Sequence, residues 1–263
     1  MIEYLHAGGH RLEFQWIEPG RPGLPALVWL HQGLGSVSMW RDFPVKVAER
    51  TGCGALVYSR HGHGNSDVLA APRPEDFMEI EGDVVLPEVL RARGLEDVIL
   101  IGHSDGGTAA LAYAGMGHRL RALVVVAPHV CLEAATLGAI IEQRANWAGS
   151  VSRERLARHH LDADALFKGW SDVWLSLQSR GWSIEHLLDG ITCPVLAIQG
   201  REDTHGTMIQ IDNIALRARG PVQLEKWDHC GHDPFRDQPE RMLDTLAAFV
   251  AQQSRCHWEG ECE

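Results

Sequence analysis

The segment GHSDGG at residues 102–107 places a serine in a G-x-S-x-G spacing that suits nucleophilic chemistry. The apolar run 98–101 before it predicts a strand, and the small residues 108–114 after it predict a helix. A serine on such a sharp strand-to-helix turn has a strained backbone, and its hydroxyl is exposed above the sheet. The glycines on either side keep the turn free of colliding side chains. The pattern predicts that Ser104 is a nucleophile.

A serine nucleophile needs a base and an acid that orients the base. His232, in CGHDP at 230–234, is the predicted base, and Asp203, in QGRED at 199–203, is the predicted acid. Both follow predicted strands, so their loops and the serine turn should meet at one edge of a parallel sheet. The order serine, acid, histidine is the order of an α/β-hydrolase nucleophile elbow. The competing residues are His229 for the base and, for the acid, Glu202, Asp228 and Asp233.

The oxyanion of an acyl-transfer reaction needs backbone N–H donors, each typically worth ~3 kcal/mol of transition-state stabilisation. One expected donor is the N–H of Asp105, the residue after the nucleophile. The other comes from the glycine-rich loop after the apolar run 26–30, where Gly33 or Leu34 can direct its N–H into the site.

The side chain of Asp105 is unexpected beside a site where negative charge develops. At ~5–6 Å and an effective dielectric constant near 20, the repulsion would be roughly 3 kcal/mol. We therefore expect the Asp105 carboxylate to turn away from the pocket. It would then bond N–H groups in the first turn of the following helix, or pair with a nearby cation.

The elements that must position these residues alternate between strands and helices. Continuous apolar strands between helices predict a parallel sheet covered on both faces. The helix over 76–92 should turn Ile80, Val84, Val85 and Val89 inward, and Pro87 should kink it or start a new segment. The predicted strands lie near 2–6, 11–17, 26–30, 54–58, 97–101, 123–127, 194–198 and 221–227; further helices lie near 39–50, 206–217 and 236–252.

Residues 130–190 carry no strand pattern and hold four of the nine tryptophans. An all-helical insert between two parallel strands lies over their carboxyl ends, where ligands bind. We interpret it as a helical cap, with 1–129 and 191–263 forming the core. Trp170 and Trp174 are four residues apart, which first indicates the buried stripe of a helix, and lining of the substrate pocket is the alternative. His103 and His31 flank the site and are expected mainly to position loops, and for His103 the alternative is that it lines the substrate pocket.

Composition excludes several other classes of protein. The chain has 263 residues and a formal net charge of -11, with no long Lys/Arg run, which argues against nucleic acid or an anionic membrane as partner. No secretory signal is visible at the N-terminus, so a cytoplasmic protein, monomeric or homodimeric, is expected. No cofactor is expected. His61, His63, His229 and His232 invite a metal interpretation, but loops at a sheet edge explain them without a metal. Reduced thiols are expected for cysteines 53, 131, 193, 230, 256 and 262.

The chain resembles the α/β-hydrolase fold superfamily, in particular its capped, single-domain, cofactor-free serine hydrolases. The resemblance rests on LHQGLGS at 30–36, SRHGHGNSD at 59–67, IGHSDGG at 101–107, and the acid and histidine motifs above. It implies an eight-stranded, mostly parallel sheet with an antiparallel second strand, a helical cap after the sixth strand, and a triad of Ser104, Asp203 and His232. One departure is Gln32, inserted between the His and Gly of the usual H-G-x oxyanion motif.

Acyl transfer to water is the predicted reaction, on a small to medium ester or lactone. A hydrolase of C–C bonds in ring-cleavage dienoates is an alternative, and it would need a cationic clamp such as Arg144 or Arg153, Arg155 and Arg158. A cofactor-free lyase or synthase could use the same triad for general acid–base catalysis. A ligand receptor that retains the triad is the alternative outside enzymes.

Overall fold

The computed structural model describes residues 2–255, and the residues after 255 lie outside it. The sequence also predicts that the polar tail 254–263 is frayed. That tail from residue 256 on, with the thiols of Cys256 and Cys262, lies outside the described residues. The sheet has eight strands, as predicted: β1 (Glu3–Ala7), β2 (His10–Ile17), β3 (Ala26–Leu30), β4 (Ala55–Tyr58), β5 (Val98–His103), β6 (Ala122–Val126), β7 (Val195–Gly200) and β8 (Val222–Trp227).

The strands form one sheet in the order β1-β2-β4-β3-β5-β6-β7-β8. β2 pairs antiparallel with both of its neighbours, whereas every pairing from β4 to β8 is parallel. The prediction of an eight-stranded, mostly parallel sheet with an antiparallel second strand is confirmed. Strands β3 to β7 are buried along their whole length, which explains why they read as continuous apolar runs.

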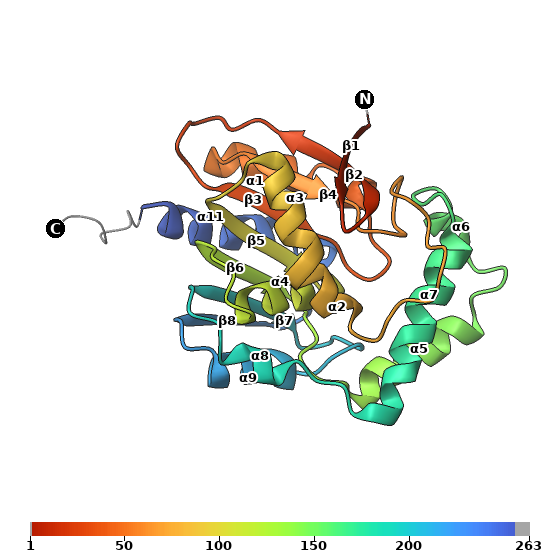
Figure 1. Cartoon of the computed structure of the whole chain (residues 1–263). Coiled ribbons are helices and arrows are strands. Elements are labelled where there is room, and N and C mark those ends of the chain that lie inside the picture. The colour runs from red at the N-terminus through yellow and green to blue at the C-terminus, as the bar shows by residue number, and fades with distance from the viewer. Residues whose placement is uncertain (1, 256–263) are drawn as a thin grey trace.

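Helices cover both faces of the sheet (Figure 1). One face packs against α1 and α11, whose apolar side chains share a core with β3, β4 and β5. The other face packs against α2 to α4, α8 and α9. The bounds are η1 (Val37–Trp40), α1 (Phe43–Thr51), α2 (Phe77–Ile80), η2 (Glu81–Val85), α3 (Leu86–Arg93), α4 (Asp105–Gly115), α5 (Ala134–Ala145), α6 (Val151–Leu156), α7 (Ala163–Ser176), η3 (Leu177–Arg180), α8 (Glu185–Leu188), α9 (Ile209–Arg217), α10 (Pro234–Asp237) and α11 (Pro239–Arg255).

The predicted helix 76–92 was wrong about two of the four side chains expected to face inward. Val89 is buried and Val85 is partly buried against the core, whereas Ile80 and Val84 are 36% and 45% exposed. The reason is a π-helical segment, η2, which adds a residue to the turn and rotates the buried face before α3 begins beside Pro87. Gly82 is buried in this segment. Only glycine fits there, because a Cβ would lie 2.6 Å from the Ala109 carbonyl oxygen. The π turn thus lets η2 pack tightly on α4.

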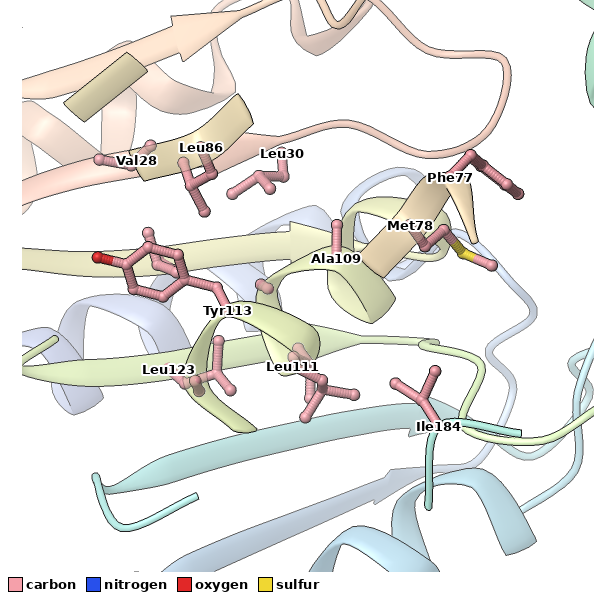
Figure 2. Close-up of a cluster of buried hydrophobic side chains, with 14 of the residues drawn as sticks. Val28, Leu30, Phe77, Met78, Leu86, Ala109, Leu111, Tyr113, Leu123 and Ile184 are labelled. Atoms are coloured by element: carbon pink, nitrogen blue, oxygen red, sulfur yellow. The ribbon is translucent and has the colours of Figure 1, made fainter. Parts of the chain in front are cut away.

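The core beneath α4 fixes the strand that carries the serine turn. Figure 2 shows apolar side chains of β3 and α4 meeting those of α2 and α3, among them Leu30, Ala109 and Met78. Most of α4 is buried, and its small residues allow the helix to lie directly on β5 and β6. The first turn of α4 is therefore held rigidly over the sheet.

The helices between β6 and β7 divide into two groups. α5, α6 and α7 pack on one another and lie together beside the sheet, away from the helices that cover its faces (Figure 1). α8 instead packs on α4 and α9 and belongs to the covered face. Within residues 2–255, no helix is both long and apolar enough to cross a membrane.

Candidate active site

Ser104 lies at the sharp turn between β5 and α4. Its φ of 52° is in the left-handed region, which a residue with a side chain rarely adopts, so the backbone is strained. The flanking glycines allow the close approach: a Cβ on Gly102 would lie 2.4 Å from the Gly106 carbonyl oxygen, and one on Gly106 would lie 2.3 Å from that of Leu30. The sequence G-x-S-x-G is thus a packing requirement of this turn.

The structure brings the three predicted side chains together, although they lie far apart in the sequence. His232 Nε2 is 2.9 Å from Ser104 Oγ, and His232 Nδ1 is 2.8 Å from Asp203 Oδ2. With a proton on Nδ1, the imidazole donates to the carboxylate and accepts the hydroxyl proton of the serine. This arrangement prepares the hydroxyl for proton transfer.

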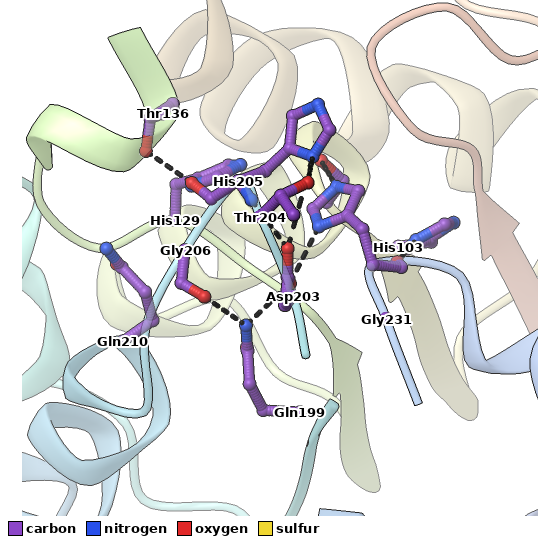
Figure 3. Close-up of polar contacts among 12 residues, drawn as sticks. His103, His129, Thr136, Gln199, Asp203, Thr204, His205, Gly206, Gln210 and Gly231 are labelled. Atoms are coloured by element: carbon purple, nitrogen blue, oxygen red, sulfur yellow. Dashed lines mark hydrogen bonds and ion pairs between the residues drawn. The ribbon is translucent and has the colours of Figure 1, made fainter. Parts of the chain in front are cut away.

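Asp203 is held by further donors in the loop after β7 (Figure 3). Its Oδ1 accepts from the N–H of His205 at 2.7 Å, and its Oδ2 accepts from Gln199 Nε2 at 2.7 Å. Burial opposes the charge of the carboxylate, but the hydrogen bond and charge of His232 outweigh it and lower the pKa of Asp203. The carboxylate is therefore kept ionised, as the orienting acid requires.

The competing residues have other partners. Glu202 accepts the backbone N–H groups of His229 and Cys230, so it shapes the histidine loop instead of contacting the imidazole. Asp228 pairs with Arg201 at 2.9 Å. The ring of His232, and not that of His229, contacts Ser104.

Backbone N–H groups near Ser104 are available for an oxyanion. Asp105 is the first residue of α4, so its N–H has no partner within the helix. The N–H groups of Gly33 and Leu34 donate no hydrogen bond to the described residues, and both residues line the cavity beside Ser104. The inserted Gln32 closes the turn by accepting the Gly35 N–H at 2.9 Å.

Buried side chains hold this loop from behind. Arg60 donates from Nη2 to the carbonyl oxygens of His31 and Gln32, at 2.9 and 3.0 Å. His160, between α6 and α7, accepts the Gly64 N–H at Nδ1 and lies 3.2 Å from the Leu34 carbonyl oxygen at Nε2. Burial lowers the pKa of His160 to about 4, so the ring is neutral and can donate to that oxygen. The helical segment thus contacts the oxyanion loop directly.

Ser104 and His232 open into a cavity of about 400 Å³. The sheet loops form one wall of the cavity, and α5, α6 and α7 contribute to the other. Trp170 and Trp174 are both buried and both line it. The two tryptophans are thus buried and also line the cavity, which agrees with the alternative interpretation that they line the substrate pocket.

The expectation for Asp105 was wrong in direction and in partners. The carboxylate lines the cavity, and its Oδ2 accepts the indole N–H groups of Trp170 at 3.2 Å and Trp174 at 3.5 Å. Among residues 2–255, neither a first-turn N–H nor a cation forms a hydrogen bond or ion pair with the carboxylate. Burial raises the pKa of Asp105, opposed by the charges of Arg60 and Arg73. The helices of a distant segment, which local sequence cannot reveal, supply the two donors.

His103 does not line the cavity in the described part of the chain, which differs from its assignment to the substrate pocket. Its Nε2 lies 2.7 Å from the carbonyl oxygen of His232 and its ring packs against Phe235. His31 is buried and accepts the Arg60 N–H at Nε2. Both histidines position loops, as the other expectation stated.

Sequence reasoning missed His129 and His205, which line the cavity on either side of His232. Both follow the carboxyl ends of strands, β6 and β7, and this position is the signal that could have found them. Burial lowers the pKa of His129 to about 3 and that of His205 to about 4, so both rings are neutral near pH 7.

His205 also completes a group of potential metal ligands with Asp203 and His232, the one such group within residues 2–255. Both ring nitrogens of His232 are already engaged by Ser104 and Asp203. The hydrogen-bonded arrangement therefore accounts for this cluster.

The fold is that of an α/β hydrolase. Residues 27–245 match the model of the alpha/beta hydrolase family, and the chain belongs to that family. Among curated relatives, the chain is 35% identical to the 2-succinyl-6-hydroxy-2,4-cyclohexadiene-1-carboxylate synthase of Yersinia pseudotuberculosis over 252 residues, which cover 88% of this chain and 89% of the relative. It is 36% identical to the Yersinia enterocolitica synthase of that name over 138 residues, 50% of this chain and 46% of the relative.

A solved structure with the same fold is an esterase from Exiguobacterium antarcticum. It superposes with a TM-score of 0.75 at 20% identity and covers 95% of this chain and 99% of its own. At this identity the likeness concerns the fold.

Proposed function

We propose that this protein is a serine hydrolase that cleaves a small to medium carboxylic ester or lactone through an acyl-enzyme on Ser104. The observation that carries the proposal is the line of contacts from Asp203 through His232 to Ser104, at 2.8 and 2.9 Å, at the wall of a cavity. Unpartnered N–H groups beside the serine supply what an oxyanion would need.

In the proposed reaction, His232 Nε2 takes the proton of Ser104 as Oγ attacks the carbonyl carbon. The N–H of Asp105, with that of Gly33 or Leu34, stabilises the oxyanion. His232 then donates the proton to the leaving alcohol as the C–O bond breaks. Water enters, loses a proton to His232, attacks the acyl-enzyme, and releases the acid and Ser104.

We assign α5, α6 and α7 as the cap that selects the substrate. Their tryptophans give the cavity an apolar wall, and Trp147 and Phe167, whose stacked rings are 3.7 Å apart, line it as well. A volume of about 400 Å³ lies within the range of small-molecule sites. A compact acyl group suits this wall better than a long chain.

The test is covalent. A fluorophosphonate probe should label the wild type at one site that peptide mass spectrometry maps to Ser104, and Ser104→Ala should not be labelled. Incubation with 4-nitrophenyl acetate and acid quenching should leave an acetyl group on the same peptide. A folded wild type that neither labels nor acetylates would contradict the proposal and favour a receptor.

A synthase is the second candidate, because the curated relatives carry that name at 35% identity over most of the chain. The product named there bears a ring carboxylate and a succinyl group, which call for cations in the site. Here Arg144 pairs with Asp172 and Arg153 with Asp164. Arg155 is the one arginine among the lining residues described, and it is exposed.

The same cation argument weighs against a C–C hydrolase of dienoates, which would need a carboxylate clamp. Turnover of a panel of neutral esters, from acetate to octanoate, separates the candidates. An esterase hydrolyses the short members with acyl-enzyme formation. A synthase or C–C hydrolase would turn over none of them efficiently.

A further inference from the structure

The carboxylate of Asp105 is only half satisfied within the protein. The residue is 2% exposed, and Oδ2 accepts two indole N–H groups, whereas Oδ1 has no hydrogen-bond partner among the described residues. Asp105 lines the cavity that Ser104 lines. Oδ1 is not one of the fully buried unsatisfied side-chain atoms of the described residues, so it is accessible from the cavity, where water or a donor group of a ligand can bond it.

The nearest cations cannot fill this role. Arg60 and Arg73 act on Asp105 through their charge, but neither forms an ion pair or hydrogen bond with it. Both guanidinium groups donate elsewhere: Arg60 to the oxyanion loop, and Arg73 to the carbonyl oxygen of His61 at 3.1 Å. They help to keep Asp105 ionised while Oδ1 stays open to the cavity.

No cation of the described cavity wall competes for Oδ1. His129 and His205 are neutral near pH 7, because burial lowers the pKa of the first to about 3 and of the second to about 4. Arg155 is exposed at the mouth. The inner wall therefore offers an anionic acceptor and uncharged groups, which favours a cationic or hydrogen-bond-donating ligand.

The position of the carboxylate also sets where such a group would lie. Asp105 directly follows Ser104 and lines the same cavity, so a donor on Oδ1 would lie in the cavity that also holds the carbonyl under attack. An unneutralised Asp105 would repel the developing oxyanion. A protonated amine on the substrate would cancel that repulsion and would also donate a hydrogen bond to Asp105 Oδ1.

We propose that Asp105 binds a protonated amine on the acyl part of the substrate, on the carbon next to the scissile carbonyl or the one after it. The inference rests on the proposed ester hydrolysis and names its substrate class: esters of small amino acids. Asp105 is then a specificity-determining residue.

The experiment compares benzyl esters that differ at one atom: L-alanine (amine), L-lactate (hydroxyl) and propionate (neither). Rates are measured at about pH 6.5, where an α-amino group is still mostly protonated. Each kcat/KM is divided by the rate of hydroxide hydrolysis, which removes intrinsic reactivity. We expect the alanine ester to exceed propionate by at least about 30-fold, as for a buried charged pair, with lactate between them.

Asp105→Asn should lower kcat/KM for the alanine ester and raise it for propionate, because the variant loses the ammonium partner and the repulsion at once. The matched control is Asp172→Asn, which removes a carboxylate of α7 that pairs with Arg144 and Lys168 outside the cavity. The control should keep the wild-type ratio of the two esters. Melting temperatures report whether each variant folds.

The outcomes separate this inference from the proposed function. If wild type hydrolyses all three esters at equal normalised rates, or prefers lactate to alanine, the amine site is wrong while serine hydrolysis stands. If no ester is hydrolysed and Ser104 does not label, the proposed function fails. Should Asp105→Asn not fold, the wild-type ranking alone decides, and a flat ranking overturns the inference.

Discussion

The two walls of the cavity are built differently. In the wall of sheet loops, the carboxylate of Asp203 takes donors from the same wall, because Gln199 and the His205 N–H fix it. The helical wall contributes side chains on α5 to α7, and the indoles of Trp170 and Trp174 directly contact Asp105 of the sheet wall. The buried carboxylates of Asp203 and Asp105 thus differ in which wall of the cavity supplies their hydrogen-bond donors.

The difference teaches which property each wall controls. A serine, an imidazole and a carboxylate held by strand ends can do the same chemistry under any helical wall. The side chains of α7 instead decide which substrates fit, and two of them hold the Asp105 carboxylate that favours a cationic group. We therefore expect substitutions of the sheet-wall residues at the serine to lower kcat, and substitutions in the helical wall or at Asp105 to change selectivity or KM.

The largest effect should come from Ser104→Ala. The variant should fold normally, because alanine keeps the backbone of the turn and removes only the hydroxyl oxygen, and it should lose on the order of 10⁶ in kcat. Ester turnover and thermal melting measure the two properties. Retention of more than a few per cent of activity would place the nucleophile elsewhere.

Asp203→Asn should follow, with a loss of about 10⁴ in kcat, because an amide no longer holds His232 in the tautomer that accepts the serine proton. Glu202→Gln is the comparison: its carboxylate bonds only the backbone of the histidine loop, so its loss should be far smaller. Equal losses for the two variants would mean that the loop, and not the carboxylate at His232, matters.

At the junction of the two walls, His129 should make the fold sensitive to acid. The pKa of its folded form, about 3, lies below the ordinary 6.5, so unfolding takes up a proton between these values and stability falls as pH falls. This term removes about 2 kcal/mol of unfolding free energy between pH 8 and pH 5. Denaturant titrations of His129→Gln should show a shallower pH slope than wild type, and identical slopes would contradict the assignment.

The smallest effect should be at the rim of the helical wall. Arg155→Gln should leave kcat for neutral esters unchanged and alter KM for any substrate by less than about 5-fold, because an exposed charge contributes at most about 1 kcal/mol. An acidic ester that loses much more than this in kcat/KM would revive the carboxylate-clamp alternative.

Sequence patterns predicted the sheet and its strand positions closely, since fully buried parallel strands are continuous apolar runs. The prediction that Ile80 and Val84 face inward was wrong because a π turn changes the helical period without a local sequence signal. Only the tertiary contact of Gly82 with α4 explains that turn. Ser104, Asp203 and His232 were predictable because each follows a strand end in a recognisable loop. His129 and His205 follow strand ends as well, but no motif marks them.

By itself, the sequence determined that a strained serine, a histidine and an aspartate would gather at one sheet edge, because strand order and loop position are encoded locally by apolar runs and glycines. Only the tertiary structure decided where the Asp105 side chain points and which groups donate hydrogen bonds to it. Its donors stand 65 and 69 residues away on α7, and whether a buried carboxylate faces a cavity or a helix turn depends on packing between those distant elements.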